Sequence, residues 1–225
     1  MNIAKEFDSI SEGYTGKITR WVPYYHNLME AIVHNLPAGF QPTRILDLGC
    51  GNGNTTALLL TRFPHAHYTL LDASPEMIRE SRERFSENAQ FSFVEAYFQE
   101  ADFPEHHFDL VAGGLSVHHL KGHEKQAVFG NICRWLRPGA CFSFSDLFVN
   151  KADEPLHSRV IEGWKRDAFA LGTTEADWNW IMDHYQQYDH PDSFSDQLQW
   201  LENAGFTEAS VTWSLESWGN ILARK

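Results

Sequence analysis

Three closely spaced glycines are the part of the sequence best suited to binding a ligand. An apolar run leads through Asp47 into Gly49, Gly51 and Gly53, and Thr55 follows shortly after them. Glycine adopts positive φ angles and leaves the main chain bare, so a ligand can lie directly against the backbone. The turn after the first strand of an open α/β sheet is also where such sheets bind ligands. We therefore predict a ligand-binding loop at these glycines.

The sequence separation between the glycines and a later carboxylate is also informative. Asp72 ends the apolar run Tyr68–Asp72, about twenty residues after Gly53. At the tip of the neighbouring strand, a carboxylate can accept hydrogen bonds from both hydroxyls of a ribose. A dinucleotide site expects the spacing G-x-G-x-x-G, whereas this loop has G-x-G-x-G and Asn54 in the place of the last glycine. The pattern therefore disfavours a nicotinamide-dependent oxidoreductase.

The glycine loop, with Asp47 just before its first glycine, resembles the first motif of the class I S-adenosylmethionine-dependent methyltransferases. Phe108–Val111 and Leu136–Gly139 resemble two later patterns of that family, and the likeness extends over about residues 40–148. The resemblance implies a Rossmann-like α/β fold with a seven-stranded, mostly parallel sheet and helices on both faces. It also implies S-adenosyl-L-methionine as cofactor and methyl transfer to a small-molecule acceptor by in-line displacement.

The same resemblance implies which residues hold the cofactor. They are Tyr25, Asp47, Gly49, Cys50, Gly51, Gly53, Asp72, Ala73, Met77, Ala96, Tyr97, Gly114 and Leu115. Asp47 would order the loop and reach the cofactor's ammonium group, directly or through water, and Tyr25 would reach its carboxylate. The family usually has a Gly-Asp pair near the adenine. Ala96 and Tyr97 stand there in this chain, so we expect stacking or main-chain contacts to hold the base.

A looser likeness covers the N-terminal helices. Phe7, Asp8 and the segment Val22–Tyr25 resemble the lid of small-molecule members, including the bacterial synthase that makes carboxy-S-adenosylmethionine. That synthase needs an arginine in its extra helices, but Met182 aligns with it and residues 167–223 contain no lysine or arginine. We therefore expect ordinary S-adenosylmethionine. A modified-cofactor synthase and a non-catalytic S-adenosylmethionine-binding sensor remain as alternatives.

Three side chains near the expected cleft could act on an acceptor. His118 and His119 follow the fourth strand, and Asp146 lies near the end of the fifth. A histidine can deprotonate a hydroxyl or amine because its pKa lies near working pH, and Asp146 could orient an amine or accept a proton. Loop packing and capping are the alternatives for all three. Alignment of nucleophile and methyl group supplies most of the needed rate, so a base is optional.

The histidines also raise the question of a metal. His118, His119 and His123 are close in sequence, and folding of the extra helices could bring His184 and His190 near them. Metal-dependent members of the family mostly use carboxylate and amide oxygens. We therefore predict no metal ligand.

Charge limits the acceptor. The chain carries a formal net charge of −12, and residues 167–223 hold ten acidic residues. A nucleic-acid enzyme normally presents a basic surface, so we expect a small molecule, either an amine or neutral. The aromatic residues of the two extra helices expected within 152–188 could face such a ligand; the alternative is a solvated acidic face over an aromatic core. These aromatic residues are Trp164, Trp178, Trp180, Tyr185 and Tyr188.

Short apolar runs alternate with amphipathic stretches, which indicates βαβ units in one domain of 225 residues. We predict a helical lid (1–40), a cofactor-binding core (41–150), a helical insertion over the substrate side (151–190), and a C-terminal helix with an antiparallel strand pair (191–225). Strands are expected at Arg44–Leu48, His67–Leu71, Phe91–Glu95, Phe108–Ala112, Cys141–Phe148, Phe206–Trp213 and Trp218–Ala223. The absence of a membrane-length apolar run and of a secretion signal predicts a cytoplasmic protein without membrane partners. A homodimer stays open, with Trp213 and Trp218 as candidates for its seam.

Overall fold

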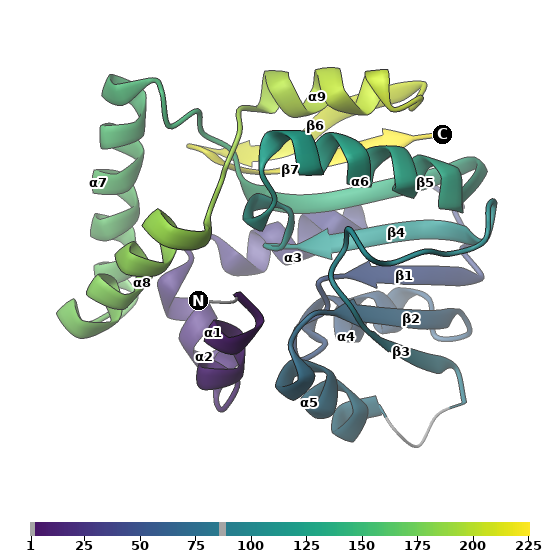
Figure 1. The fold of residues 1–225 in the computed structure, drawn as a ribbon, viewed down its shortest axis with the longest axis horizontal. Coiled ribbons are helices and arrows are strands. Elements are labelled where there is room, and N and C mark those ends of the chain that lie inside the picture. The colour runs from purple at the N-terminus through teal and green to yellow at the C-terminus, as the bar shows by residue number, and fades with distance from the viewer. Residues whose placement is uncertain (1–2, 86–88) are drawn as a thin grey trace.

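The computed structural model describes residues 3–85 and 89–225, and a seven-stranded sheet in the order β3-β2-β1-β4-β5-β7-β6 runs through it (Figure 1). The strands are β1 (Arg44–Leu48), β2 (His67–Asp72), β3 (Phe91–Glu95), β4 (Phe108–Gly114), β5 (Leu136–Leu147), β6 (Glu208–Leu215) and β7 (Trp218–Arg224). Strands β1 to β5 pair in parallel, and β7 is antiparallel to both β5 and β6. The predicted Rossmann-like fold is confirmed.

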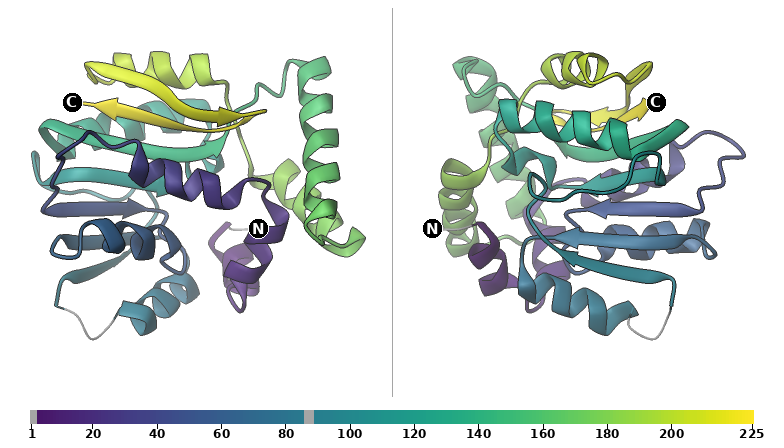
Figure 2. Two further views of the ribbon diagram at one scale, coloured as in Figure 1. Left: turned by 180° about the vertical axis from the view of Figure 1, so that it is seen from behind. Right: turned by 45° about the vertical axis from the view of Figure 1, so that its right-hand side comes forward.

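Helices cover both faces of the sheet and one of its ends. They are α1 (Ile3–Ile10), α2 (Tyr14–Trp21), α3 (Tyr25–His34), α4 (Asn54–Arg62), α5 (Pro75–Phe85), the 3₁₀ turn η1 (Val117–His119), α6 (Gly122–Trp135), α7 (Glu154–Ala170), α8 (Glu175–Tyr188) and α9 (Phe194–Asn203). Helices α3 and α4 lie on one face, and α5, α6 and α9 lie on the other (Figure 2). Helices α1, α2, α7 and α8 stand beyond the carboxyl ends of the parallel strands (Figure 1). We call these four helices the helical cap.

The central strands are apolar because helices cover them on both faces. Ile45, Leu46 and Leu48 of β1 are fully buried. Two buried serines of β5 fasten α3 to the sheet: Ser143 donates to a main-chain carbonyl of α3 at 3.0 Å, and Ser145 donates to another at 2.6 Å. These bonds satisfy hydroxyls that would otherwise be costly to bury.

Two boundaries differ from those predicted. Strand β5 is expected at Cys141–Phe148, but it begins at Leu136, directly after the last residue of α6, and includes Pro138-Gly139. Proline is tolerated there because the pairing of β4 with β5 is irregular at this point. The predicted helical lid is interrupted between Trp21 and Tyr25. Residues before a proline favour extended backbone, so Val22 is extended and α3 begins only at Tyr25.

The other strand boundaries agree within two residues, including β6, which is predicted two residues early at Phe206–Trp213. No helix in residues 3–85 and 89–225 is both long and apolar enough to cross a membrane.

Candidate functional site

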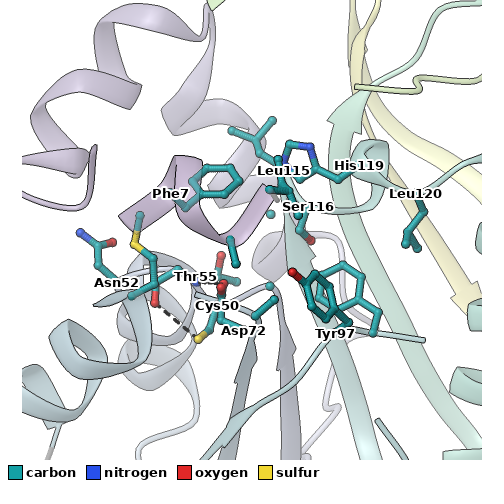
Figure 3. Close-up of a pocket in the computed structure, with 18 of the residues that line it drawn as sticks. Phe7, Cys50, Asn52, Thr55, Asp72, Tyr97, Leu115, Ser116, His119 and Leu120 are labelled. Atoms are coloured by element: carbon teal, nitrogen blue, oxygen red, sulfur yellow. Dashed lines mark hydrogen bonds between the residues drawn. The ribbon is translucent and has the colours of Figure 1, made fainter. Parts of the chain in front are cut away.

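A cavity lies at the carboxyl ends of β1, β2 and β4, where the glycine loop faces α1 (Figure 3). It encloses about 1110 Å³, part of which is open to solvent. We call it the loop cavity. Ten of the residues predicted to hold the cofactor line it: Tyr25, Gly49, Cys50, Gly51, Asp72, Ala73, Met77, Tyr97, Gly114 and Leu115. The other three, Asp47, Gly53 and Ala96, lie outside its lining.

The three glycines of the loop have positive φ angles but different surroundings. A Cβ atom on Gly49 would lie 2.4 Å from Ser116, and one on Gly53 would lie 2.4 Å from the Phe85 ring. A Cβ on Gly51 would meet only the Met77 sulfur, at 4.0 Å. Gly49 and Gly53 therefore allow close packing within the protein, whereas Gly51 leaves open space beside bare main chain.

Asp72 closes the loop from the neighbouring strand. Its Oδ2 accepts the Gly51 N–H at 2.8 Å, and its Oδ1 accepts the Ser74 N–H at 2.9 Å. Each carboxylate oxygen has further acceptor capacity, and the residue lines the cavity. Burial raises the pKa of Asp72. Donors from a ligand would replace the hydration that this carboxylate has lost.

Asp47 lies behind the loop. It is fully buried and accepts a hydrogen bond from the Thr56 hydroxyl at 2.5 Å, while its Oδ1 has no hydrogen-bond partner. Burial raises the pKa of Asp47 to about 7. It thus ties β1 to α4, and its contact with an ammonium group stays a prediction. Tyr25 faces the cavity, where its hydroxyl accepts a hydrogen bond from the Asn54 amide at 3.0 Å.

The segment after β3 supplies flat and polar surfaces to the loop cavity. Tyr97, Phe98 and Gln99 all line it, whereas Ala96 packs against the hydrophobic core. The sequence predicts only Ala96 and Tyr97 here, because the family pattern stops at that pair. The chain turns inward after β3, and this brings the next two side chains to the ligand as well.

A second cavity adjoins the first and lies between the helical cap and the ends of the central strands. It encloses about 590 Å³ and is walled mainly by aromatic and aliphatic side chains, so we call it the aromatic cavity. Its aromatic walls include Phe7, Trp21, Trp164, Trp180 and Trp218. The two cavities share Phe7, Tyr14, Leu115 and His119. In Figure 3, Phe7, Leu115 and His119 lie together on the side of the loop cavity opposite Cys50 and Asp72.

Leu115 stands where the two cavities meet. It has a φ of 56°, in the region that non-glycine residues rarely adopt, and its N–H donates to the Ser145 carbonyl at 2.8 Å. This backbone turns the side chain toward the ligand spaces at the end of β4. Strained backbone of this kind is concentrated at functional sites.

The polar part of the aromatic cavity begins with a histidine held by a carboxylate. Asp146 pairs with Nδ1 of His118 and accepts the His118 N–H at 2.9 Å. Burial alone would lower the pKa of His118, but the charges of Asp146 and Asp189 outweigh it and raise the pKa. Asp146 itself lines neither cavity, so of the predicted catalytic residues only the two histidines reach the ligand spaces.

Asp189 joins this group from the residue after α8. Its Oδ1 lies 3.0 Å from His119 Nδ1, 3.4 Å from His184 Nε2 and 3.6 Å from His118 Nε2. Burial would raise the pKa of Asp189, but the surrounding imidazoles hold it well below its usual range. Burial and the neighbouring His118 lower the pKa of His119 to about 4.

Asp189 is not predicted as a site residue; from the sequence it is only one of the ten acidic residues in 167–223. No local pattern singles it out, because its partners come from a loop about seventy residues earlier in the chain. His123, which the sequence analysis groups with the other histidines, is absent from this cluster. His190 lines the loop cavity instead of joining the cluster.

The family match to known proteins falls within the predicted cofactor-binding core (41–150). Residues 45–139 match the family described as methyltransferase domain. A trans-aconitate 2-methyltransferase from Methylobacterium nodulans is 32% identical over 172 residues, which is 74% of this chain and 58% of the relative. A malonyl-[acyl-carrier protein] O-methyltransferase from Paenibacillus sp. is 33% identical over 53% of this chain and 44% of the relative. The chain thus spans about half the length of the curated relatives it matches.

Solved structures share the fold at low sequence identity. A chain from the solved complex between the Haloferax volcanii Trm112 methyltransferase activator and a methyltransferase has a TM-score of 0.70 and 16% identity, with 97% of each chain covered. Human N-acetylserotonin methyltransferase in complex with S-adenosylmethionine has a TM-score of 0.65 and 18% identity, with 99% of this chain and 56% of that chain covered.

Proposed function

This chain carries a class I, S-adenosylmethionine-dependent methyltransferase domain, and we propose that it methylates a small neutral or cationic molecule bound in the aromatic cavity. The observation that carries the proposal is the junction of the two cavities at Leu115 and His119. A cofactor in the loop cavity and an acceptor in the aromatic cavity would meet there, as in-line transfer requires.

The loop cavity fits the cofactor on three counts. Gly51 leaves open space beside bare main chain, Asp72 faces the cavity with spare acceptor capacity, and Oδ1 of Asp47 is a buried acceptor without a hydrogen-bond partner behind the loop. We assign the ribose hydroxyls to Asp72 and the amino-acid part to the loop, with Tyr25 near its carboxylate. Bound S-adenosylmethionine would supply an activated methyl group on a sulfonium.

The protein's own contribution is to position the acceptor and exclude water. The helical cap covers the carboxyl ends of the strands, and Phe7 from α1 lines both cavities. Asp8 fastens α1 to the start of α5, since it accepts hydrogen bonds from the Ser74 hydroxyl at 2.6 Å and the Glu76 N–H at 3.3 Å. Expelling water strengthens the electrostatic interactions within the site.

The choice of a neutral or cationic acceptor rests on the walls of the aromatic cavity. No lysine or arginine is among its described lining residues, while Asp189 and several indole rings are. Aromatic faces and carboxylates stabilise cations, and a carboxylate acceptor would find no cationic side chain there. The names of the two relatives above refer to carboxylic-acid acceptors, so we place this chain's acceptor in a different class.

The test has two steps. Titration calorimetry with S-adenosylmethionine and S-adenosylhomocysteine should give heat for both, with one site per chain. Initial rates of labelled methyl transfer are then compared across matched amines, alcohols and carboxylic acids. Faster methylation of amines or alcohols supports the proposal, and a preference for acids would overturn the assigned acceptor class.

The same experiment separates the alternatives. Cofactor binding without transfer to any acceptor would indicate a sensor. A carboxylated cofactor found by mass spectrometry after purification would indicate a modified-cofactor synthase; Met182, which aligns with the arginine of that synthase, lines neither cavity. Roles for His118 or His119 as a base stay predictions, with Asp146 as a positioning residue behind His118.

A further inference from the structure

We propose that His118, His119 and Asp189 bind a divalent first-row transition-metal ion, such as zinc, in the wall of the aromatic cavity. No metal is predicted from the sequence, because the sequence does not reveal that Asp189 lies beside the two histidines. The structure brings one ligand atom from each of the three residues within 4.8 Å of one another.

The separations suit a single ion. Oδ1 of Asp189 lies 3.0 Å from Nδ1 of His119 and 3.6 Å from Nε2 of His118. Bonds of about 2.0–2.2 Å in a tetrahedral site place ligand atoms about 3.3–3.6 Å apart. The two observed distances bracket this range, so small side-chain movements complete the geometry.

His118 is already oriented as a ligand. Asp146 pairs with its Nδ1, which directs the hydrogen to that nitrogen and leaves Nε2 free toward Asp189. Asp146 is itself fixed, because it accepts the N–H groups of His118 and Leu147, each at 2.9 Å. Metal-binding histidines almost always hold a carboxylate or carbonyl on their other nitrogen in this way.

The facing atoms are poorly satisfied by one another. Nδ1 of His119 and Oδ1 of Asp189 are buried and 3.0 Å apart, an ion-pair distance, but neither atom is aligned for a hydrogen bond of regular geometry. Two atoms directed at a shared ion would show this arrangement. Lys151, a nearby ammonium group, donates to the main-chain carbonyls of Tyr185 and Asp189 at 3.1 Å and 2.7 Å, and not to the Asp189 carboxylate.

The charges of the cluster also match a divalent ion. Asp146 and Asp189 are 1% and 5% exposed, so two carboxylates share one buried site. With neutral imidazoles their charges sum to −2, which a divalent cation balances. His184 adds a third imidazole, with its Nε2 3.4 Å from Oδ1 of Asp189 and its own Nδ1 buried without a partner. Imidazole nitrogen with carboxylate oxygen is a donor set suited to zinc and iron(II).

The site has a consequence that rests on the proposed function. Both histidines line the aromatic cavity, so open coordination positions would face the acceptor. A metal ion there would bind an oxygen, nitrogen or sulfur atom of a neutral acceptor and lower the pKa of its proton. Because Asp189 would then neutralise the metal ion, the proposed acceptor class narrows from neutral or cationic molecules to neutral ones. The two imidazoles would then serve as ligands and not as bases.

The experiment uses the untagged full chain after chelator treatment. Titration calorimetry with Zn²⁺ alone, and visible absorption on addition of Co²⁺ alone, should each give one ion per chain. Replacing Asp189→Asn or His118→Gln should weaken Zn²⁺ binding at least about 100-fold, and Asp146→Asn about 10–100-fold. The exposed Asp183 of α8, the helix that directly precedes Asp189, provides the control, and Asp183→Asn should leave Zn²⁺ affinity unchanged.

Binding of S-adenosylhomocysteine is measured on the same samples. It reports folding of each variant, and it separates failure of this inference from failure of the proposed function. Binding of S-adenosylhomocysteine without stoichiometric binding of Zn²⁺ or Co²⁺ would overturn the metal site and leave the proposed function standing. Zn²⁺ binding that survives both Asp189→Asn and His118→Gln would overturn the metal site as well.

Discussion

The loop cavity and the aromatic cavity meet at Leu115 and His119 but are built by different means. The first is built around the main chain of the glycine loop at the ends of β1, β2 and β4, with the half-buried carboxylate of Asp72 facing it and side chains from α1, α3 and the segment after β3 around it. The second is formed mainly by large side chains from the helical cap, from the segment after β4 and from the adjoining ends of β5 and β7. Main-chain geometry recognises a cofactor common to a whole family. Side chains from variable helices can be changed without disturbing it, which leaves the acceptor free to differ between members.

The largest expected effect comes from removing one carboxylate from each cavity in turn. Asp72→Ala should weaken S-adenosylhomocysteine binding about 300-fold, because hydrogen bonds to a charged group contribute about 1.5–3 kcal/mol each. Asp189→Ala should leave that affinity within about twofold of the wild-type value. Titration calorimetry on both variants, with circular dichroism as the folding check, measures the difference. Equal losses would mean that the cavities form one site.

A second pair of variants tests the division of labour within the glycine loop. Gly53→Ala should lower the free energy of unfolding by about 2–3 kcal/mol, because its Cβ would overlap the Phe85 ring. Gly51→Ala should cost only about 1 kcal/mol in stability, from its positive φ, yet lower cofactor affinity about tenfold or more. Urea unfolding and calorimetry measure the two effects. Unimpaired cofactor binding by Gly51→Ala would argue against ligand contact at that glycine.

The buried Asp47 makes the loop region sensitive to pH. Its pKa of about 7 lies above the value in an unfolded chain, so raising the pH ionises it more readily in the unfolded state. Stability contributed by its protonated form is complete below about pH 4 and is lost as the pH rises to about 7. Relative to Asp47→Asn, the wild type should lose about 2 kcal/mol of stability between pH 5 and pH 8. Parallel stability curves from urea unfolding would exclude this assignment.

The smallest expected effect concerns the aromatic cavity. Trp180 lies between Trp21 and His184, at ring-centroid distances of 5.0 Å and 5.1 Å, and lines only this cavity. Trp180→Ala should raise the acceptor's KM about tenfold, or about 1.4 kcal/mol, with no change in cofactor affinity. Steady-state kinetics with the acceptor found above, alongside calorimetry, test this. A loss of cofactor affinity would instead show that Trp180 also supports the cofactor site, which would contradict separate roles for the two cavities.

The two regions also differ in how far the sequence reveals them. Ten of thirteen predicted cofactor residues line the loop cavity, because strand-end glycines and Asp72 follow a fixed spacing along the chain. Gly53 and Asp47 support the loop from behind, a distinction that depends on packing against Phe85 and Thr56. Spacing alone carries no information about such neighbours.

The polar group of the aromatic cavity could be predicted only in part. His118 and His119 follow β4, Asp146 lies near the end of β5, and all three are identified from the sequence. Asp189 reaches them because α7 and α8 fold back over the sheet, a tertiary arrangement that no local pattern encodes. The start of β5 at Leu136, ahead of the predicted Cys141, escaped prediction for a related reason, since pairing of β5 with β4 overrides the turn preference of Pro138-Gly139.

A crystal structure with bound S-adenosylhomocysteine tests the central claim most directly. The account predicts both ribose hydroxyls on the Asp72 carboxylate, the amino-acid part beside Gly51, and the sulfur directed past Leu115 into the aromatic cavity. A ribose held away from Asp72, or a sulfur directed away from that cavity, would contradict it.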